Sequence, residues 1–116
     1  AEEAIRMEVD MRLNDLKAHK DSMSKGDYVL ARIKIKAITV DFEVIGTSDG
    51  RSDDLQQVDG IDGDLEERLN TLGITTLDQL SKMDAESAED INDAIEYMPG
   101  RIRRQLWAEQ AKILLE

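Results

Sequence analysis

The chain has 116 residues, of which 41% are hydrophobic and 35% are charged, and it carries a formal net charge of -11. This length allows one compact domain with an attached element, and it is too short for a large enzyme with a deep cleft. Because the sequence has no cysteine, disulfides, thiolate metal sites and a cysteine nucleophile are excluded.

The acidic excess lies almost entirely in the second half of the chain. Residues 53–116 contain 16 acidic and 6 basic residues, whereas residues 1–52 contain 10 acidic and 9 basic ones. Such a field repels polyanions at long range and favours basic partners. Aromatic residues are scarce, so the core must consist of aliphatic side chains, a composition that suits helices.

Residues 2–23 fit two hydrophobic periodicities, a helical face and a half-buried strand. We favour the helix because Glu, Arg, Lys, Met, Leu and Ala are good helix formers and Gly26 provides a stop. Residues 1–27 are therefore predicted to form an amphipathic helix, with a coiled coil as one of its uses. Its candidate interaction face comprises Ile5, Val9, Leu13 and Leu16. We expect this face to pack on a partner helix, on another copy or on the rest of the chain.

Residues 28–52 are predicted to be an extended, β-rich connector followed by a linker. β-Branched residues dominate up to residue 46, and their alternation slips by one residue at Ala37-Ile38. We expect residues 38–45 to be extended, while helix and strand remain open for residues 28–37. The glycines and turn formers of residues 46–54 indicate the linker.

Residues 53–116 are predicted to form an acidic domain of five short helices. Ser52 can cap the first helix, which would bury Leu55 and Val58. After a turn at residues 59–63, the second helix is indicated by the spacing of its leucines and by Gly73, a left-handed stop that Ile74 would close. Its buried face comprises Leu65, Leu69 and Leu72.

Capping signals then mark three more helices. Thr76 and Gln79 form a capping box for the third, and Asp84 can cap the fourth. Pro99-Gly100 breaks the chain before a last helix that begins near residue 101. The side chains expected to face the core in the third, fourth and last helices are Leu77, Leu80, Ile91, Ala94, Ile95, Met98, Ile102, Leu106, Trp107, Ala111 and Leu114.

The segment LQQVDGIDGDLEERLNTLGI resembles the helix-hairpin-helix superfamily, and residues of about 30–116 resemble a bacterial type of this domain that is also described as flap-endonuclease-like. Similar segments extend a large-subunit ribosomal protein and a subunit of NADH-quinone oxidoreductase, and they follow coiled or membrane-anchored front ends in uncharacterised proteins. The resemblance is specific for the fold and weak for function, because one domain serves unrelated proteins.

DNA-binding members of the superfamily hold a phosphate on the backbone amides of the hairpin turn. Here the turn comprises Gly60, Ile61, Asp62 and Gly63, and Asp62 stands where the second glycine belongs. Carboxylates also replace the basic residues expected in the following helical turn. We therefore expect a structural hairpin whose amides are capped by the protein's own aspartates, because a carboxylate repels phosphate at such short range.

Two basic clusters are candidate anion-binding or partner-binding sites. Arg101, Arg103 and Arg104 stand beside Trp107 and form the basic cluster of the acidic half. These arginines could form a clamp for a phosphate or carboxylate, or they could only neutralise the surrounding acidic residues. The second cluster could meet an acidic partner, the acidic domain of another copy, or only solvent. It comprises Lys17, Lys20, Lys25, Arg32, Lys34 and Lys36.

The sequence offers little for catalysis, and we expect no enzyme activity, no cofactor and no metal. His19 is the only histidine, it lies in a polar stretch, and it is expected on the surface. The carboxylates of DGIDGD are too closely spaced for a calcium loop and lack its distal glutamate.

We therefore expect a mainly α, non-enzymatic module for protein–protein interaction or assembly, part of a larger complex and dependent on a protein partner or on self-association. A nucleic-acid-binding helix-hairpin-helix module, contacting a DNA or ribosomal RNA backbone, is the alternative. The net negative charge of the chain disfavours binding to nucleic acid. No segment of the sequence is apolar enough to insert into a membrane. We expect a cytoplasmic location. Residues before Ala1 could attach the protein to a membrane or to a large complex.

Overall fold

The computed structural model describes residues 2–116, and within them the fold is mainly α, as expected. Its longer α-helices are α1 (Glu2–Lys17), α2 (Lys25–Lys36), α4 (Gly63–Leu72), α6 (Ala85–Ala94) and α8 (Trp107–Leu114). The shorter α-helices are α3 (Phe42–Ile45), α5 (Leu77–Ser81) and α7 (Arg101–Arg104). Three 3-10 turns complete the fold, η1 (Lys20–Ser22), η2 (Ala37–Thr39) and η3 (Leu55–Gln57).

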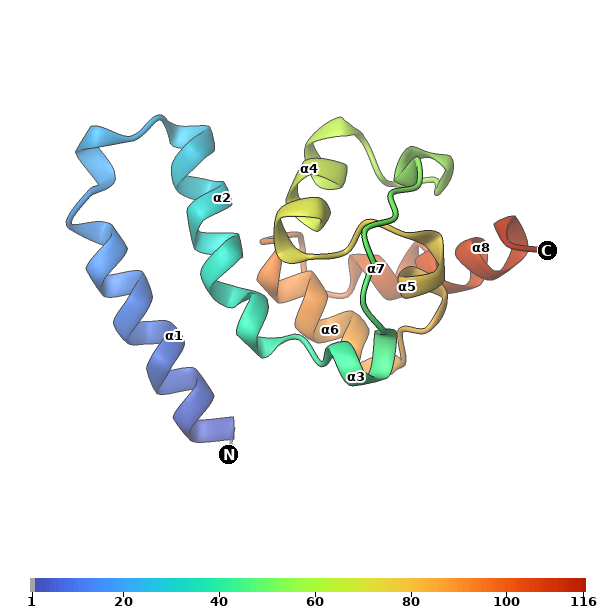
Figure 1. Ribbon diagram of the computed structural model, residues 1–116, viewed down its shortest axis with the longest axis horizontal. Helices are drawn as coiled ribbons and strands as arrows, with labels where there is room; N and C mark the ends of the chain where they lie inside the picture. Colours follow the sequence, from blue (N-terminus) through green and yellow to red (C-terminus); the bar gives the residue numbers. More distant parts are fainter. Residues whose placement is uncertain (1) are drawn as a thin grey trace.

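Helices α1 and α2 form an antiparallel pair, the N-terminal hairpin, at one end of the molecule (Figure 1). Helix α1 confirms the helical interpretation of its sequence, but it ends at Lys17, and Gly26 lies inside the first turn of α2. The break between the helices is closed by Ser24, whose side chain accepts a hydrogen bond from the Asp27 backbone N–H. Helix α2 packs on α4 and carries Ile33 into the core.

The prediction that residues 38–45 are extended is wrong. Residues 37–39 form η2 and residues 42–45 form α3, with Val40 and Ile45 buried in the same core as Ile33. β-Branched residues have only a weak intrinsic preference for strands, and burial in a helical core overrides it here. One hydrophobic core therefore runs from α2 to α8, across the linker.

The linker lies against the helical core and is held there by hydrogen bonds. The Gln79 amide donates to the backbone oxygens of Gly46 and Gly73, both at 3.1 Å, and the Asp53 carboxylate accepts from the Leu77 backbone N–H at 2.8 Å. Asp54, rather than the predicted Ser52, caps η3. Asp53 thus supports the start of α5, which lies far from it in sequence.

The caps and core leucines of the second half follow the prediction. Gly73 ends α4 in the left-handed conformation with φ +109°, and the capping box of Thr76 and Gln79 opens α5. Asp84 caps α6. The buried set includes Leu55, Val58, Leu65, Leu69, Leu72, Ile74, Leu77, Leu80, Ile91, Ala94, Ile95, Ile102, Trp107 and Ala111.

The last helix differs from the prediction because the chain breaks at Leu106, which has φ +58°. Two helices result, α7 and α8, and Leu106 itself is 53% exposed rather than buried. Met98 and Leu114 were also expected inside and are exposed. On either side of the break, Gln105 is half-buried and Trp107 is fully buried.

Candidate interaction site

The hairpin turn, residues 59–63, connects η3 to α4, whose first residue is Gly63, and Asp62 caps the start of that helix. Asp62 Oδ1 accepts a hydrogen bond from the Leu65 backbone N–H at 2.9 Å. Glu66 accepts from the Leu55 backbone N–H at 2.8 Å and thereby ties α4 to η3. Ile61 is buried beneath the turn, while Gly60, Asp62 and Gly63 are exposed.

Two glutamines from the end of the chain occupy the inner side of the hairpin turn. Gln110 Oε1 accepts from the Asp59 backbone N–H at 2.8 Å, and its Nε2 donates to the Asp59 carbonyl at 3.1 Å. A side chain on Gly60 would collide with Gln105 and would approach Trp107 Nε1 to 3.0 Å. Gly60 is therefore required for packing against α8 and its entry, and also for its φ of +105°.

Gln105 links three elements at this point. Its Oε1 accepts from Trp107 Nε1 at 3.0 Å and from the Tyr97 hydroxyl at 3.3 Å. The rings of Tyr97 and Trp107 are stacked with their centres 5.7 Å apart. Sequence reasoning missed both glutamines; the contact of Gln110 with Asp59 spans 51 residues and leaves no local signal.

Some backbone groups of the hairpin turn are already occupied, whereas the N–H groups of Asp62, Gly63 and Asp64 form no hydrogen bond within residues 2–116. Asp59 N–H is bonded to Gln110, the Leu65 N–H is bonded to Asp62, and Gly60 is packed against Gln105. The exposed carboxylates Asp59, Asp62 and Asp64 surround what remains. An incoming phosphate would meet negative charge at close range, where repulsion is strong.

The three arginines are placed by a buried asparagine on α6. Asn92 is 1% exposed, accepts from the Ile102 backbone N–H at 3.0 Å, and donates to the carbonyls of Tyr97 and Met98. It thereby fixes the chain that leads into α7. Nothing in the sequence pattern singled out Asn92.

Arg103 and Arg104 border a groove of about 700 Å³ between α6 and the α7–α8 corner. The groove has an apolar floor that includes Met83 and Ile102, and Leu106 stands at its edge. Among the ion pairs formed within residues 2–116, none involves these arginines or Arg101. Arg104 donates instead to the Pro99 carbonyl at 3.1 Å.

The second basic cluster is divided by the fold. Arg32 and Lys36 both hold Glu96, at 2.6 and 2.8 Å, and so join α2 to the end of α6. Burial alone would raise the pKa of Glu96, but the hydrogen bonds and charges of the two cations outweigh it and lower the pKa to about 2. Lys34 remains exposed, and Lys36 lines a different pocket from Arg103 and Arg104.

That other pocket, of about 350 Å³, lies where the N-terminal hairpin meets α6, and it is lined by Ile5, Lys36 and Asp90 among others. Burial, followed by the neighbouring charges of Glu86, Asp93, Glu2 and Asp84, raises the pKa of Asp90.

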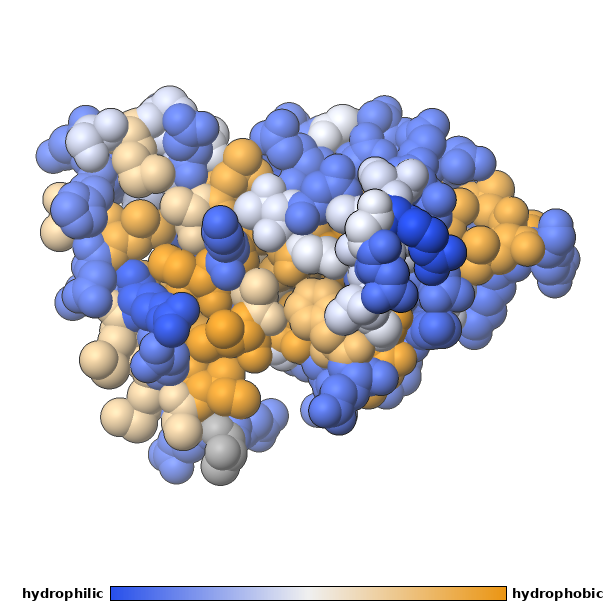
Figure 2. All heavy atoms as spheres, in the orientation of Figure 1, coloured by the Kyte–Doolittle hydropathy of each residue, from blue (hydrophilic) through white to orange (hydrophobic). Residues whose placement is uncertain are grey.

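The candidate face of α1 is turned toward α2. Val9 is 8% exposed, Leu13 and Leu16 are half-buried, and Ile5 is 41% exposed. In the seam between α1 and α2, apolar side chains gather on the face shown in Figure 2. This face therefore contributes first to the protein's own N-terminal hairpin.

Within residues 2–116, no three metal-ligating side chains come close enough to hold an ion. His19 is exposed in the loop after α1. No helix in this range has the length and apolarity that crossing a bilayer requires.

Several proteins are similar to this chain over more than half of its length. Small ribosomal subunit protein uS2 of Rhodopseudomonas palustris (strain HaA2) is 35% identical over 71 residues, which is 61% of this chain and 20% of that protein. The same protein from Xanthobacter autotrophicus (strain Py2) is 34% identical over 73 residues, 63% of this chain and 21% of that protein. By name, these ribosomal relatives are proteins of the small subunit.

An uncharacterised 22.9 kDa protein in the nqo2 3' region of Paracoccus denitrificans is 35% identical over 63 residues, 54% of this chain and 29% of that protein. The chain thus spans less than a third of the length of each of these three relatives. No solved structure matches it. The profile of the RS2/RL21/YNQ2 helix-hairpin-helix domain matches residues 55–115, more than half of the chain, and the protein therefore belongs to this family.

Proposed function

We propose that this protein is a non-enzymatic protein–protein interaction module that attaches to a larger assembly. The observation that carries the proposal is the covered hairpin turn. Gln110 occupies the backbone of Asp59, and Gln105 and Trp107 fill the space beside Gly60. One side of the turn that holds a nucleic-acid backbone elsewhere in the superfamily therefore serves internal packing here, and the carboxylates of Asp62 and Asp64 stand at the other side.

The relatives support attachment to a complex of many components. Those named uS2 are ribosomal-subunit proteins by name, and they share this domain as about a fifth of their length. An appended domain with carboxylates around its hairpin turn is better suited to docking on a protein than on a phosphate backbone. The acidic field of residues 53–116 favours a basic partner surface.

Fractionation of a lysate from the source organism tests the proposal. The tagged protein should sediment with a large assembly at physiological ionic strength, and it should remain there after treatment with ribonuclease and deoxyribonuclease. A protein that sediments alone as a monomer would contradict the proposal. Release by nuclease would favour the second candidate.

The second candidate is nucleic-acid binding through Arg103 and Arg104, which form no ion pair within residues 2–116. It predicts binding to structured RNA or duplex DNA at low salt that weakens steeply as salt rises. Charge reversal by Arg103→Glu and Arg104→Glu should abolish that binding, whereas reversal of the exposed Lys112 on α8 should not. Our proposal expects no binding even at low salt.

A further inference from the structure

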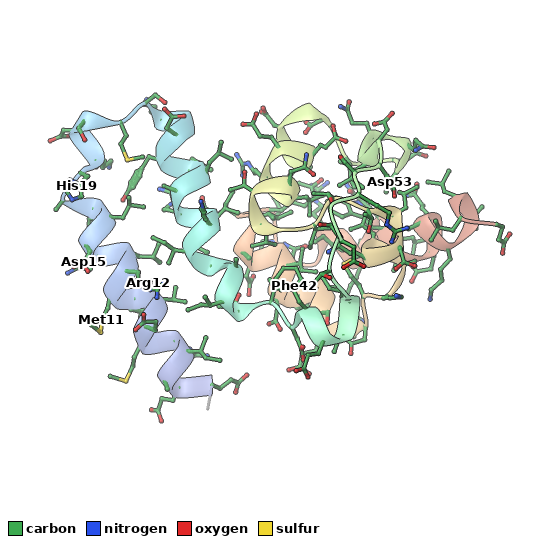
Figure 3. All side chains as sticks on the ribbon, in the orientation of Figure 1. Met11, Arg12, Asp15, His19, Phe42 and Asp53 are labelled. Carbon is green, nitrogen blue, oxygen red and sulfur yellow. The ribbon has the colours of Figure 1, made fainter. Side chains whose placement is uncertain are left out.

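Helix α1 has a second apolar stripe on the side opposite α2. With 3.6 residues per turn, Ala4, Met7 and Met11 share one face with the polar Asn14, about half a turn away from Val9. Their spacing of three, four and three residues is that of the core positions of a coiled coil. Met7 and Met11 are each 62% exposed, and Figure 3 shows Met11 pointing away from α2.

The charges beside this stripe are mainly acidic. The helical period places Glu3, Asp10 and the terminal Lys17 along one flank, and Glu8 and Asp15 along the other. Of these four carboxylates, only Glu8 forms an ion pair within residues 2–116, with Arg12 at 2.7 Å. An apolar stripe between two acidic flanks is complementary to an amphipathic helix whose flanks are basic.

We propose that the outer stripe of α1 docks a basic amphipathic helix of a partner protein, with Lys or Arg over these flanks. This inference rests on the proposed interaction function and specifies its surface. A second copy of α1 would bring the four flanking carboxylates against those of the first, with only Lys17 to offset them, which is unfavourable. An anionic membrane surface would be repelled by the same carboxylates.

The packing of α1 on α2 holds α1 in its helical conformation before a partner binds. Its 16 residues span about 24 Å, which is roughly two heptads and marginal for two free helices. Because α1 already packs on α2 and η2, only the partner helix loses conformational freedom on binding. Methionine side chains adapt easily to the partner's shape.

A pair of synthetic helices tests the inference on the full chain. One carries Leu at the core heptad positions and Lys at the flanking ones, and the other has Glu in place of Lys. The Lys peptide should bind and the Glu peptide should not. The double variant Met7→Gln/Met11→Gln should weaken Lys-peptide binding by about tenfold or more.

The exposed Met98, which is 57% exposed and lies outside α1, provides the matched control. Met98→Gln should leave the affinity unchanged, and Glu3→Gln/Asp10→Asn should lower it and flatten its salt dependence. Equal binding by wild type and the Met7/Met11 double variant would overturn the inference. Sedimentation equilibrium that shows dimers lost in this variant would overturn it in favour of a second copy.

The fractionation experiment separates this inference from the proposed function. A wild-type protein that joins an assembly while the Met7/Met11 double variant does not would support both. If both proteins join, the inference fails and the proposed function stands. If the wild type itself sediments alone, the proposed function fails.

Discussion

The hairpin turn and the N-terminal hairpin differ in how many of their side chains are engaged in contacts within the protein. At the hairpin turn, Asp62, Gln110 and Gln105 bind or cover the backbone, and Ile61 is buried. In α1, Val9 is the one buried side chain of the described helix, and Met7 and Met11 remain exposed. The contrast indicates that the turn serves mainly the fold, and that exposed apolar side chains lie on α1.

The largest expected effect comes from Trp107, which is fully buried beside the hairpin turn. Trp107→Ala should lower the free energy of unfolding by about 3–5 kcal/mol, because it leaves a large cavity. Val9→Ala, at the interface of α1 and α2, should cost about 1 kcal/mol or less and should act mainly on local opening of α1. Urea titration and hydrogen exchange measure the two effects. Equal loss in both variants would contradict the contrast.

Replacement of the two glycines of the turn by alanine should affect the free energy of unfolding differently. Gly60→Ala should destabilise by about 1–3 kcal/mol, because φ is +105° and Gln105 and Trp107 fill the space. Gly63 begins α4, and its nearest neighbour would be Gln56 Nε2 at 4.0 Å. Gly63→Ala should therefore be neutral or stabilise by about 0.5–1 kcal/mol. Loss of stability in Gly63→Ala would contradict the open space that surrounds this position at the start of α4.

Much of the second half was predictable because its signals are local. The cap of Asp84, the capping box of Thr76 and Gln79, and the stop at Gly73 each lie within a few residues of the backbone they serve. The spacing of the α4 leucines likewise predicted its buried face.

The errors occurred where distant contacts decide. Residues 38–45 were expected to be extended, but Val40 and Ile45 join a helical core supplied by the rest of the chain. The exposure of Leu106 follows from the break before α8, and the partners of the hairpin turn, Gln105 and Gln110, come from the far end of the sequence. No periodicity records such contacts.

The ion cluster that joins the N-terminal hairpin to α6 should give a measurable pH dependence. Because the pKa of Glu96 in the folded protein is lowered from 4.5 to about 2, its stabilisation is full above pH 4.5 and is lost as the pH falls toward 2. Glu96→Gln should lower the free energy of unfolding near neutral pH by about 1–2 kcal/mol, allowing for solvent screening.

Urea titrations across this pH range measure the effect. Glu109→Gln is the control, because Glu109 is exposed and forms no ion pair within residues 2–116. An unchanged pH profile in Glu96→Gln would show that Arg32 and Lys36 do not stabilise the join.

The smallest effect is expected at Asp90, in the pocket below the N-terminal hairpin. Its raised pKa means that burial and nearby acids oppose the charged form. Asp90→Asn should therefore stabilise the fold near neutral pH by up to about 0.5 kcal/mol, and this gain should disappear in acid, where Asp90 is protonated. Thermal melts at two pH values measure it. A lower melting temperature at neutral pH would show that the carboxylate has a favourable partner.

The stacked pair of Trp107 and Tyr97 gives the protein an internal optical reporter. Trp107 is the only tryptophan of the chain, and it hydrogen-bonds Gln105 directly beneath the hairpin turn. Its fluorescence therefore reports on this region alone, whereas far-ultraviolet circular dichroism sums over all helices. If the N-terminal hairpin opens before the rest unfolds, ellipticity will fall while tryptophan emission stays constant, without any label.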